Sequence, residues 1–117
     1  METVTEKTSR HQRIIVDYLK ERSAIKHANL PDCENMLVAD TENHHYQLLT
    51  TGWAPDRFIH SITFHLDIAP DGKIWIRANW TDTDIAQKLV ERGVAKSDIV
   101  LGFYPDYMRE ESEYAVC

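Results

Sequence analysis

Apolar residues recur at three- and four-residue spacing near the start of the chain. Ile15, Tyr18 and Leu19 follow this spacing, which places side chains along one stripe of a helix. We therefore expect a helix over about 5–27. Pro31 stops any continuation, because its ring lacks an N–H and disfavours helical geometry in the residue before it.

Beyond Pro31 the apolar period changes to two, which is typical of strands with one buried face. The expected strands lie at about 34–41, 44–53, 57–69 and 73–80, and the turns between them at 41–43, 54–56 and 70–72. Gly72 suits the last turn, because glycine takes positive φ without steric cost. Sequential strands with such short connections favour an antiparallel meander.

The third expected strand has the clearest alternation. Its even positions are expected to face the core, and they are Phe58, His60, Ile62, Phe64, Leu66 and Ile68. Its odd positions include His65 and Asp67, which share the opposite, polar face because successive side chains of a strand alternate. His60 is therefore predicted to be a packed, hydrogen-bonded core residue.

The helical period returns after the fourth strand. Thr81 or Thr83 can cap a helix here, and Asp82 and Asp84 favour its start, because a carboxylate is stabilised at the positive end of the helix dipole. The apolar stripe of this helix includes Leu89, and Gly93 suits its C-terminal stop. We expect only a short turn at 99–101 and then a tail from Pro105.

This order of elements predicts an α+β fold in a single domain spanning 1–117. The fold comprises an N-terminal helix, a four-stranded antiparallel meander sheet, a second helix and a C-terminal tail, with the helices covering one face of the sheet. A hydrophobic fraction of 43% is near the about 45–50% of ordinary globular proteins. The apolar runs are far shorter than the roughly 20 residues that span a bilayer, so no membrane partner is expected.

Charge narrows the choice of partners. The chain has 13 Lys and Arg against 19 Asp and Glu, a net charge of −6, so DNA phosphates would be repelled by most of its surface. Residues 1–27 are the exception, with six basic residues against four acidic ones. Arg10, Arg13 and Lys20 give the first helix a mildly basic face, which is the candidate DNA contact.

Neither the start of the chain nor its cysteines indicate export. The first ten residues contain no apolar signal core. Cys33 and Cys117 make no disulfide framework and have no zinc-ligand spacing. We therefore expect a cytoplasmic protein with two reduced thiols.

His65 and Asp67 are the strongest candidates for chemistry. An imidazole and a carboxylate on one strand face can orient a proton acceptor, or hold a metal ion if Asp40 or Glu42 adds a third ligand. The alternative is a cross-strand polar network without a ligand. The sequence has no nucleophile elbow and no glycine-rich phosphate loop. We therefore expect no enzyme activity, no catalytic residue and no cofactor.

Several blocks of the sequence match a known family. They are 46–49 with Gly52 and Trp53, 65–68, 71–76, 84–86, 89–90, 93–94 and 98–103, followed by Pro105, Arg109, Glu113 and 115–116. On these blocks the whole chain resembles the XisI-like family, the fdxN element excision controlling factors found mostly in cyanobacteria. The most specific are Asp-Gly-Lys-Ile-Trp-Ile at 71–76 and Asp-Ile-Val-Leu-Gly-Phe at 98–103.

The resemblance implies a role rather than a chemistry. Members are accessory factors in programmed excision of a DNA element during heterocyst differentiation, beside an XisH-type partner and a serine-type recombinase. No catalytic residue carries over from the family. The family tail usually continues with a histidine and two prolines after Gly-Phe, whereas this chain reads Tyr-Pro-Asp at 104–106. Candidate partner contacts in this tail are Tyr104, Pro105, Tyr107 and Arg109.

Three hypotheses of function remain open from the sequence. The first is a non-enzymatic regulatory protein that binds an XisH-type partner, with DNA contacted only indirectly. The second is a DNA-binding recombination directionality factor that uses Arg10, Arg13 and Lys20. The third is a small-ligand or metal site around His65 and Asp67. Self-association as a dimer or larger is also expected, because a meander has two open edges and one partly covered face.

Overall fold

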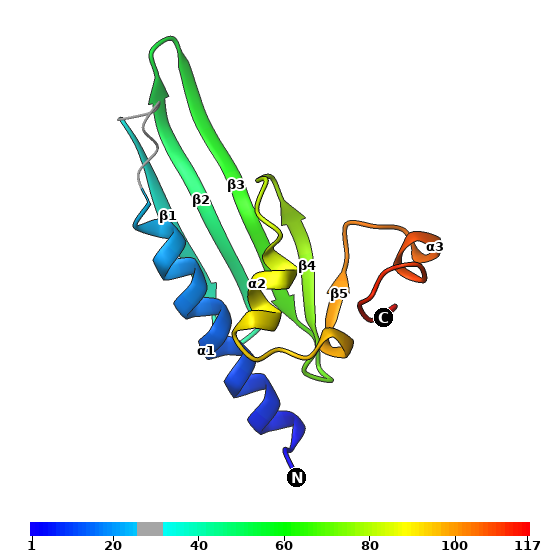
Figure 1. The fold of residues 1–117 in the computed structure, drawn as a ribbon. Helices are drawn as coiled ribbons and strands as arrows, with labels where there is room; N and C mark the ends of the chain where they lie inside the picture. The colour runs from blue at the N-terminus through cyan, green and yellow to red at the C-terminus, as the bar shows by residue number, and fades with distance from the viewer. Residues whose placement is uncertain (26–31) are drawn as a thin grey trace.

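A five-stranded sheet with helices on one side forms the body of the protein (Figure 1). The computed structural model describes residues 1–25 and 32–117. In chain order the elements are α1 (Val4–Ser23), β1 (Cys33–Asp40), β2 (His45–Ala54), β3 (Arg57–Ile68), β4 (Ile74–Asn79), α2 (Ile85–Glu91), the 3₁₀ helix η1 (Lys96–Asp98), β5 (Ile99–Leu101) and α3 (Asp106–Arg109). The predicted α+β class is confirmed.

The sheet differs from the predicted four-stranded antiparallel meander. Its order is β1-β2-β3-β4-β5, and β5 pairs with β4 in the parallel direction. The residues at 99–101, predicted as a short turn, are fully or almost fully buried and form β5. Because α2 lies between β4 and β5, the chain crosses one face of the sheet and returns in the same direction. A short, continuous apolar run is typical of such a buried parallel strand.

Helix α1 begins at a capping box. Thr3 Oγ1 accepts the backbone N–H of Glu6, and the Glu6 carboxylate accepts the backbone N–H of Thr3. The helix ends at Ser23, four residues short of the predicted end. The last two residues of the predicted helix, and the predicted stop at Pro31, lie outside the described residues.

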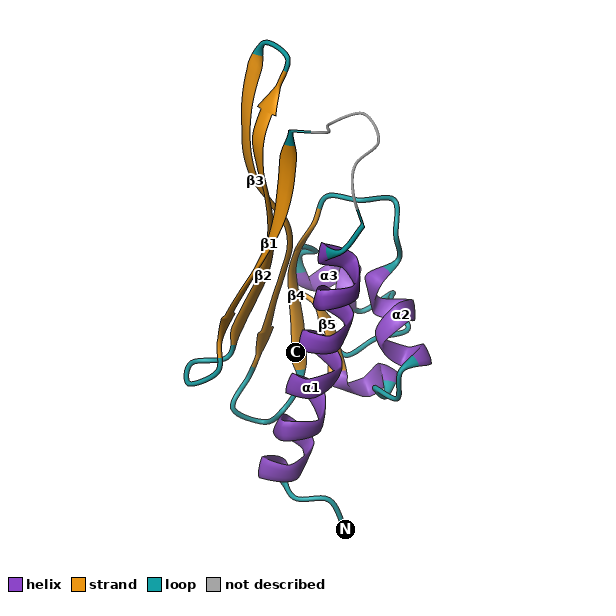
Figure 2. Cartoon of the chain, turned by 90° about the vertical axis from the view of Figure 1, so that its left-hand side faces the viewer, coloured by secondary structure: helices purple, strands orange, loops and turns teal. Residues whose placement is uncertain are grey.

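Helices α1 and α2 lie on the same side of the sheet, which we call the inner face (Figure 2). Tyr46 and Leu48 of β2, with Phe64 and Leu66 of β3, are buried on this face. From the helix side Leu19 is fully buried in the same cluster. The predicted placement of the helices is therefore correct. We call the opposite side of the sheet the outer face.

The alternation predicted for β3 is interrupted by a β-bulge. Leu48 pairs with Phe64, but the next residue of β2, Leu49, pairs with Ile62, so Thr63 is an extra residue that has no opposite residue in β2. A one-residue slip moves side chains to the other face. Of the even positions predicted to face the core, Phe58, His60 and Ile62 therefore lie on the outer face. The prediction that His60 is a core residue is wrong, since its side chain is exposed.

His11 joins α1 to the turn before β4. Its ring is fully buried, and Nδ1 donates a hydrogen bond of 2.7 Å to the carbonyl oxygen of Gly72. Its Nε2 has no hydrogen-bond partner among the described residues. Burial lowers the pKa of His11, and the bond to Gly72 opposes this only in part. The native state therefore holds a neutral imidazole with its proton on Nδ1.

A lowered pKa of His11 makes the protein less stable in mild acid. Below the ordinary histidine pKa of about 6.5, the unfolded chain binds a proton that the folded chain resists. The free energy of unfolding therefore decreases as the pH is lowered. In His11→Asn, whose amide N–H can still reach Gly72, we expect a smaller difference in unfolding free energy between about pH 7.5 and 5.5. Urea denaturation measures it. The exposed His60→Asn is the control, and an unchanged difference in His11→Asn would contradict the assignment.

Candidate functional site

Two β-bulges aim a group of polar side chains at the outer face. The bulge at Thr63 brings His45 of β2 directly opposite Asp67 of β3. In the next pair of strands, His65 pairs with Ala78 whereas Leu66 pairs with Ile76, so Arg77 is the extra residue of β4. Bulges re-aim side chains in this way where a strand bends. The result is a polar cluster that spans β2, β3 and β4 and is centred on β3.

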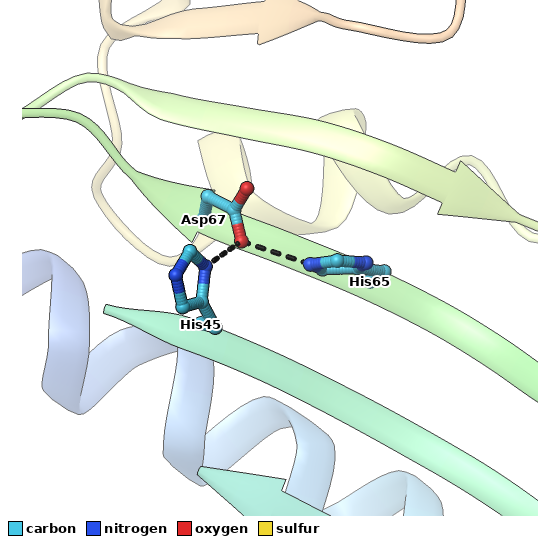
Figure 3. Close-up of side chains that lie close together, drawn as sticks. All are labelled: His45, His65 and Asp67. Atoms are coloured by element: carbon cyan, nitrogen blue, oxygen red, sulfur yellow. Dashed lines mark hydrogen bonds and ion pairs between the residues drawn. The ribbon is translucent and has the colours of Figure 1, made fainter. Parts of the chain in front are cut away.

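His45, His65 and Asp67 form the centre of this cluster, which we call the triad (Figure 3). Asp67 Oδ1 lies 2.8 Å from His45 Nδ1 and 2.9 Å from His65 Nε2. One ligand-type atom from each side chain lies within 4.8 Å of the other two. The predicted pair of His65 and Asp67 is therefore brought together, and the third member is His45 rather than the predicted Asp40 or Glu42.

The neighbours of the triad hold it in place. Arg77 Nε donates to Asp67 Oδ2 at 3.0 Å, and the Arg77 guanidinium lies 4.7 Å from the centre of the Trp75 ring. Gln47 Nε2 lies 3.5 Å from His65 Nδ1. Burial raises the pKa of Asp67, but the hydrogen bonds from His45, Arg77 and His65 outweigh it and hold the pKa below its ordinary value. The carboxylate is therefore ionised near neutral pH.

Beyond the triad, the outer face carries large apolar side chains. Trp53 and Phe58 face each other across the β2–β3 hairpin with ring centres 5.4 Å apart, and each residue is more than half exposed. Figure 1 shows this hairpin projecting past the ends of β4 and β5. A groove of about 690 Å³ lies beside it, lined by Gln47, Leu49, His60, Ser61, Ile62, Thr63 and Trp80. Exposed apolar patches of this kind mark interaction surfaces.

The predicted partner contacts of the tail have different roles in the structure. Tyr107 is 70% exposed, and Tyr104 lies against Phe103 at the surface. Pro105 is also exposed and precedes α3. Arg109, in contrast, is largely buried and is used within the tail itself, as described next.

Arg109 fastens the C-terminal tail. Its guanidinium donates to the carbonyl oxygens of Tyr104 and Val116, each at 2.9 Å, and to the carboxylate of Asp106. It also lies 5.3 Å from the centre of the Trp75 ring. A guanidinium with several fixed acceptors organises a segment more effectively than a lysine ammonium would, because its donors form a rigid fork.

The predicted DNA contacts are only partly available. Arg10 is paired with the carboxylate of Glu2 and donates to the carbonyl oxygen of Gly93 at 2.8 Å. The hydrogen bond to Glu2 raises the pKa of Arg10, so its guanidinium stays charged and paired with Glu2. Arg13 and Lys20 are exposed on α1. The basic face is therefore smaller than the sequence predicts.

The fold and the outer face define an α+β protein with helices on one side of the sheet and an open polar and aromatic surface on the other. The XisI protein family model matches residues 5–116. A crystal structure of a XisI-like protein from Anabaena variabilis ATCC 29413 is 33% identical, with a TM-score of 0.78, and the match covers 98% of this chain and 100% of that one. The chain therefore belongs to the XisI family.

A second crystal structure has the same fold. It is the fdxN element excision controlling factor XisI from Anabaena variabilis ATCC 29413, 28% identical with a TM-score of 0.78, and the match covers 95% of this chain and 99% of that one. None of the curated proteins matches this chain. In the part of the chain that the structure describes, helices are too short or too polar to cross a bilayer.

Loss of the Arg109 side chain should loosen the tail. In Arg109→Ala three hydrogen bonds are removed, so we expect the free energy of unfolding to fall by roughly 1–3 kcal/mol and chymotrypsin to cut faster after Phe103 and Tyr107. Limited chymotrypsin digestion followed by mass spectrometry measures this. Arg13→Ala, an exposed arginine on α1, is the control. Equal cleavage rates in the two variants would show that Arg109 does not fasten the tail.

Proposed function

We propose that this protein is an accessory factor that controls excision of a DNA element, and that it acts by binding an XisH-type protein rather than by catalysis. The observation that carries the proposal is the likeness to the fdxN element excision controlling factor over 95% of this chain. Membership of the XisI family supports the same role. Binding of the partner and the absence of catalysis are our inference from the family.

We expect the partner to contact the outer face near the hairpin. Trp53 is 59% and Phe58 53% exposed, and aromatic side chains that become buried on binding supply much of the energy of protein interfaces. The adjoining groove, with Leu49, Ile62 and Trp80 in its lining, offers space for an apolar side chain of the partner. This apolar surface would not stabilise a bound DNA backbone, because phosphates are bound by basic rather than apolar groups.

Direct DNA binding remains the alternative, and it depends on Arg13 and Lys20. With Arg10 held by Glu2, few basic side chains are left to replace counterions on a phosphate backbone, so we expect weak binding at most. A gel-shift titration at about 50 mM salt tests this, because electrostatic binding is strong at low salt and falls steeply as salt rises. Tight binding that Arg13→Ala and Lys20→Ala abolish would favour the alternative.

The partner interface should depend on the two hairpin aromatics. After co-expression with an XisH-type protein, we expect one co-eluting peak for the native chain in size-exclusion chromatography. We expect Trp53→Ser with Phe58→Ser to weaken binding by at least about 10-fold, the usual effect of losing an interface anchor. Isothermal titration calorimetry measures the change.

Tyr107→Ser is the matched control, because Tyr107 is an exposed aromatic of the tail. If only Tyr107→Ser weakens binding, the interface lies on the tail that the sequence indicates. If the native chain and the partner elute separately at micromolar concentration, the proposal of partner binding is wrong.

Self-association as a dimer or larger also stays a prediction. The outer face that we assign to the partner would be covered in a symmetric dimer formed through it. Light scattering of the protein alone measures its mass in solution. A value equal to that of a single chain would contradict self-association and leave the outer face free for the partner.

A further inference from the structure

The triad has the donor set of a transition-metal site. Two imidazole nitrogens and one carboxylate oxygen meet from β2 and β3, with one ligand atom of each within 4.8 Å of the others. Zinc binds histidine nitrogen at about 2.0–2.1 Å and carboxylate oxygen at about 2.0–2.2 Å. Ligand atoms around one tetrahedral ion therefore lie about 3.3–3.5 Å apart. The hydrogen-bonded atoms, now 2.8 and 2.9 Å apart, would need to separate by about half an ångström. The two imidazole nitrogens, which lie within 4.8 Å of each other, would need to reach the same spacing.

The backbone fixes these three side chains before any ion arrives. His45 and Asp67 are directly opposed in the β2–β3 ladder, and His65 lies two residues before Asp67 on the same strand. The ladder sets the spacing of the three side chains, so little chain entropy is lost when they bind an ion. A site on paired strands is more sharply defined than one built on a loop.

Neighbouring side chains that hydrogen-bond the ligands orient both the carboxylate and a histidine. Arg77 binds Oδ2 of Asp67, which leaves Oδ1 directed at the two imidazoles. Gln47 lies beside Nδ1 of His65, the ring nitrogen that does not face Asp67. Metal sites in proteins commonly have such partners on the second carboxylate oxygen and on the second ring nitrogen of a histidine, where they fix orientation and tautomer.

Solvent reaches the triad from the outer face. The side chains of His45, His65 and Asp67 are 55%, 26% and 15% exposed, respectively. An ion can therefore enter without unfolding, and three protein ligands leave a fourth tetrahedral position for water. The positive charge of Arg77 opposes a cation, but the ionised carboxylate offsets it and the imidazoles bind metal in their neutral form.

We propose that His45 Nδ1, His65 Nε2 and Asp67 Oδ1 bind one divalent transition-metal ion of the zinc class, with an open coordination position toward solvent. Two imidazoles favour zinc, cobalt, nickel or copper over magnesium and calcium, which prefer oxygen ligands. The three ligands lie outside the hairpin surface and the groove that we assign to the protein partner, although Gln47 lines the groove and also lies beside His65. Metal binding is therefore tested with the metal alone, and either proposal can fail without the other.

The test uses the untagged full chain and the metal alone. Isothermal titration calorimetry with Zn²⁺ at neutral pH should give one ion per chain, and Co²⁺ should give the visible absorption of a tetrahedral or five-coordinate site. We expect His45→Ala, His65→Ala and Asp67→Asn each to lower Zn²⁺ affinity more than about 100-fold. Loss of a residue that only hydrogen-bonds a metal ligand already lowers metal affinity about 10- to 100-fold.

His60→Ala is the matched control. His60 is an exposed histidine of β3 on the same outer face, bonded to Thr51, and its loss should leave affinity unchanged. Circular dichroism checks that each variant folds, and the highly exposed His45 makes His45→Ala the safest of the three. Binding that resists all three triad variants, Co²⁺ thiolate bands that place the ion at Cys33 or Cys117, or no heat of Zn²⁺ binding would each overturn the proposal.

Discussion

The extra residue at Thr63 in β3 decides which side chains meet on the outer face. Between the hairpin and the bulge, Trp53 opposes Phe58 and Leu49 opposes Ile62. If this register continued unbroken, His45 would oppose Leu66 and the triad would not form. The bulge shifts the remaining pairs by one residue, so that apolar residues of β3 face the helices in one half and face solvent in the other. Both candidate surfaces of the protein depend on this irregularity.

Most of the elements could be predicted from the sequence, because their periods are local properties. The long helix follows from the three- and four-residue spacing of residues such as Ile15 and Leu19, and the strands follow from the two-residue alternation of residues such as Phe64 and Leu66. β5 could not be found in the same way, since three apolar residues at 99–101 have no measurable period, and their pairing with β4 depends on where α2 places the chain. A parallel strand is defined by its crossover and not by its own sequence.

The candidate site was predictable only in part. His65 and Asp67 share a strand face whatever the register, so their pairing was visible in the sequence. His45 joins them only through the bulge, and a bulge without glycine leaves little trace in a sequence. The same slip explains why the prediction of His60 in the core is wrong. The sequence leads to His45 only when the β2–β3 residue pairs are counted from the hairpin turn with one extra residue allowed in β3.

The projecting hairpin has a consequence for how this family diverges. Near its tip, Trp53 and Phe58 contact each other rather than the helices, so replacing them removes little of what stabilises the domain. Residues such as Phe64, fully buried beneath the helices, lack this freedom. Sequence drift can therefore accumulate at the hairpin at low cost to folding. Relatives with the same inner face can acquire different binding specificities by altering a few residues of one β-ribbon.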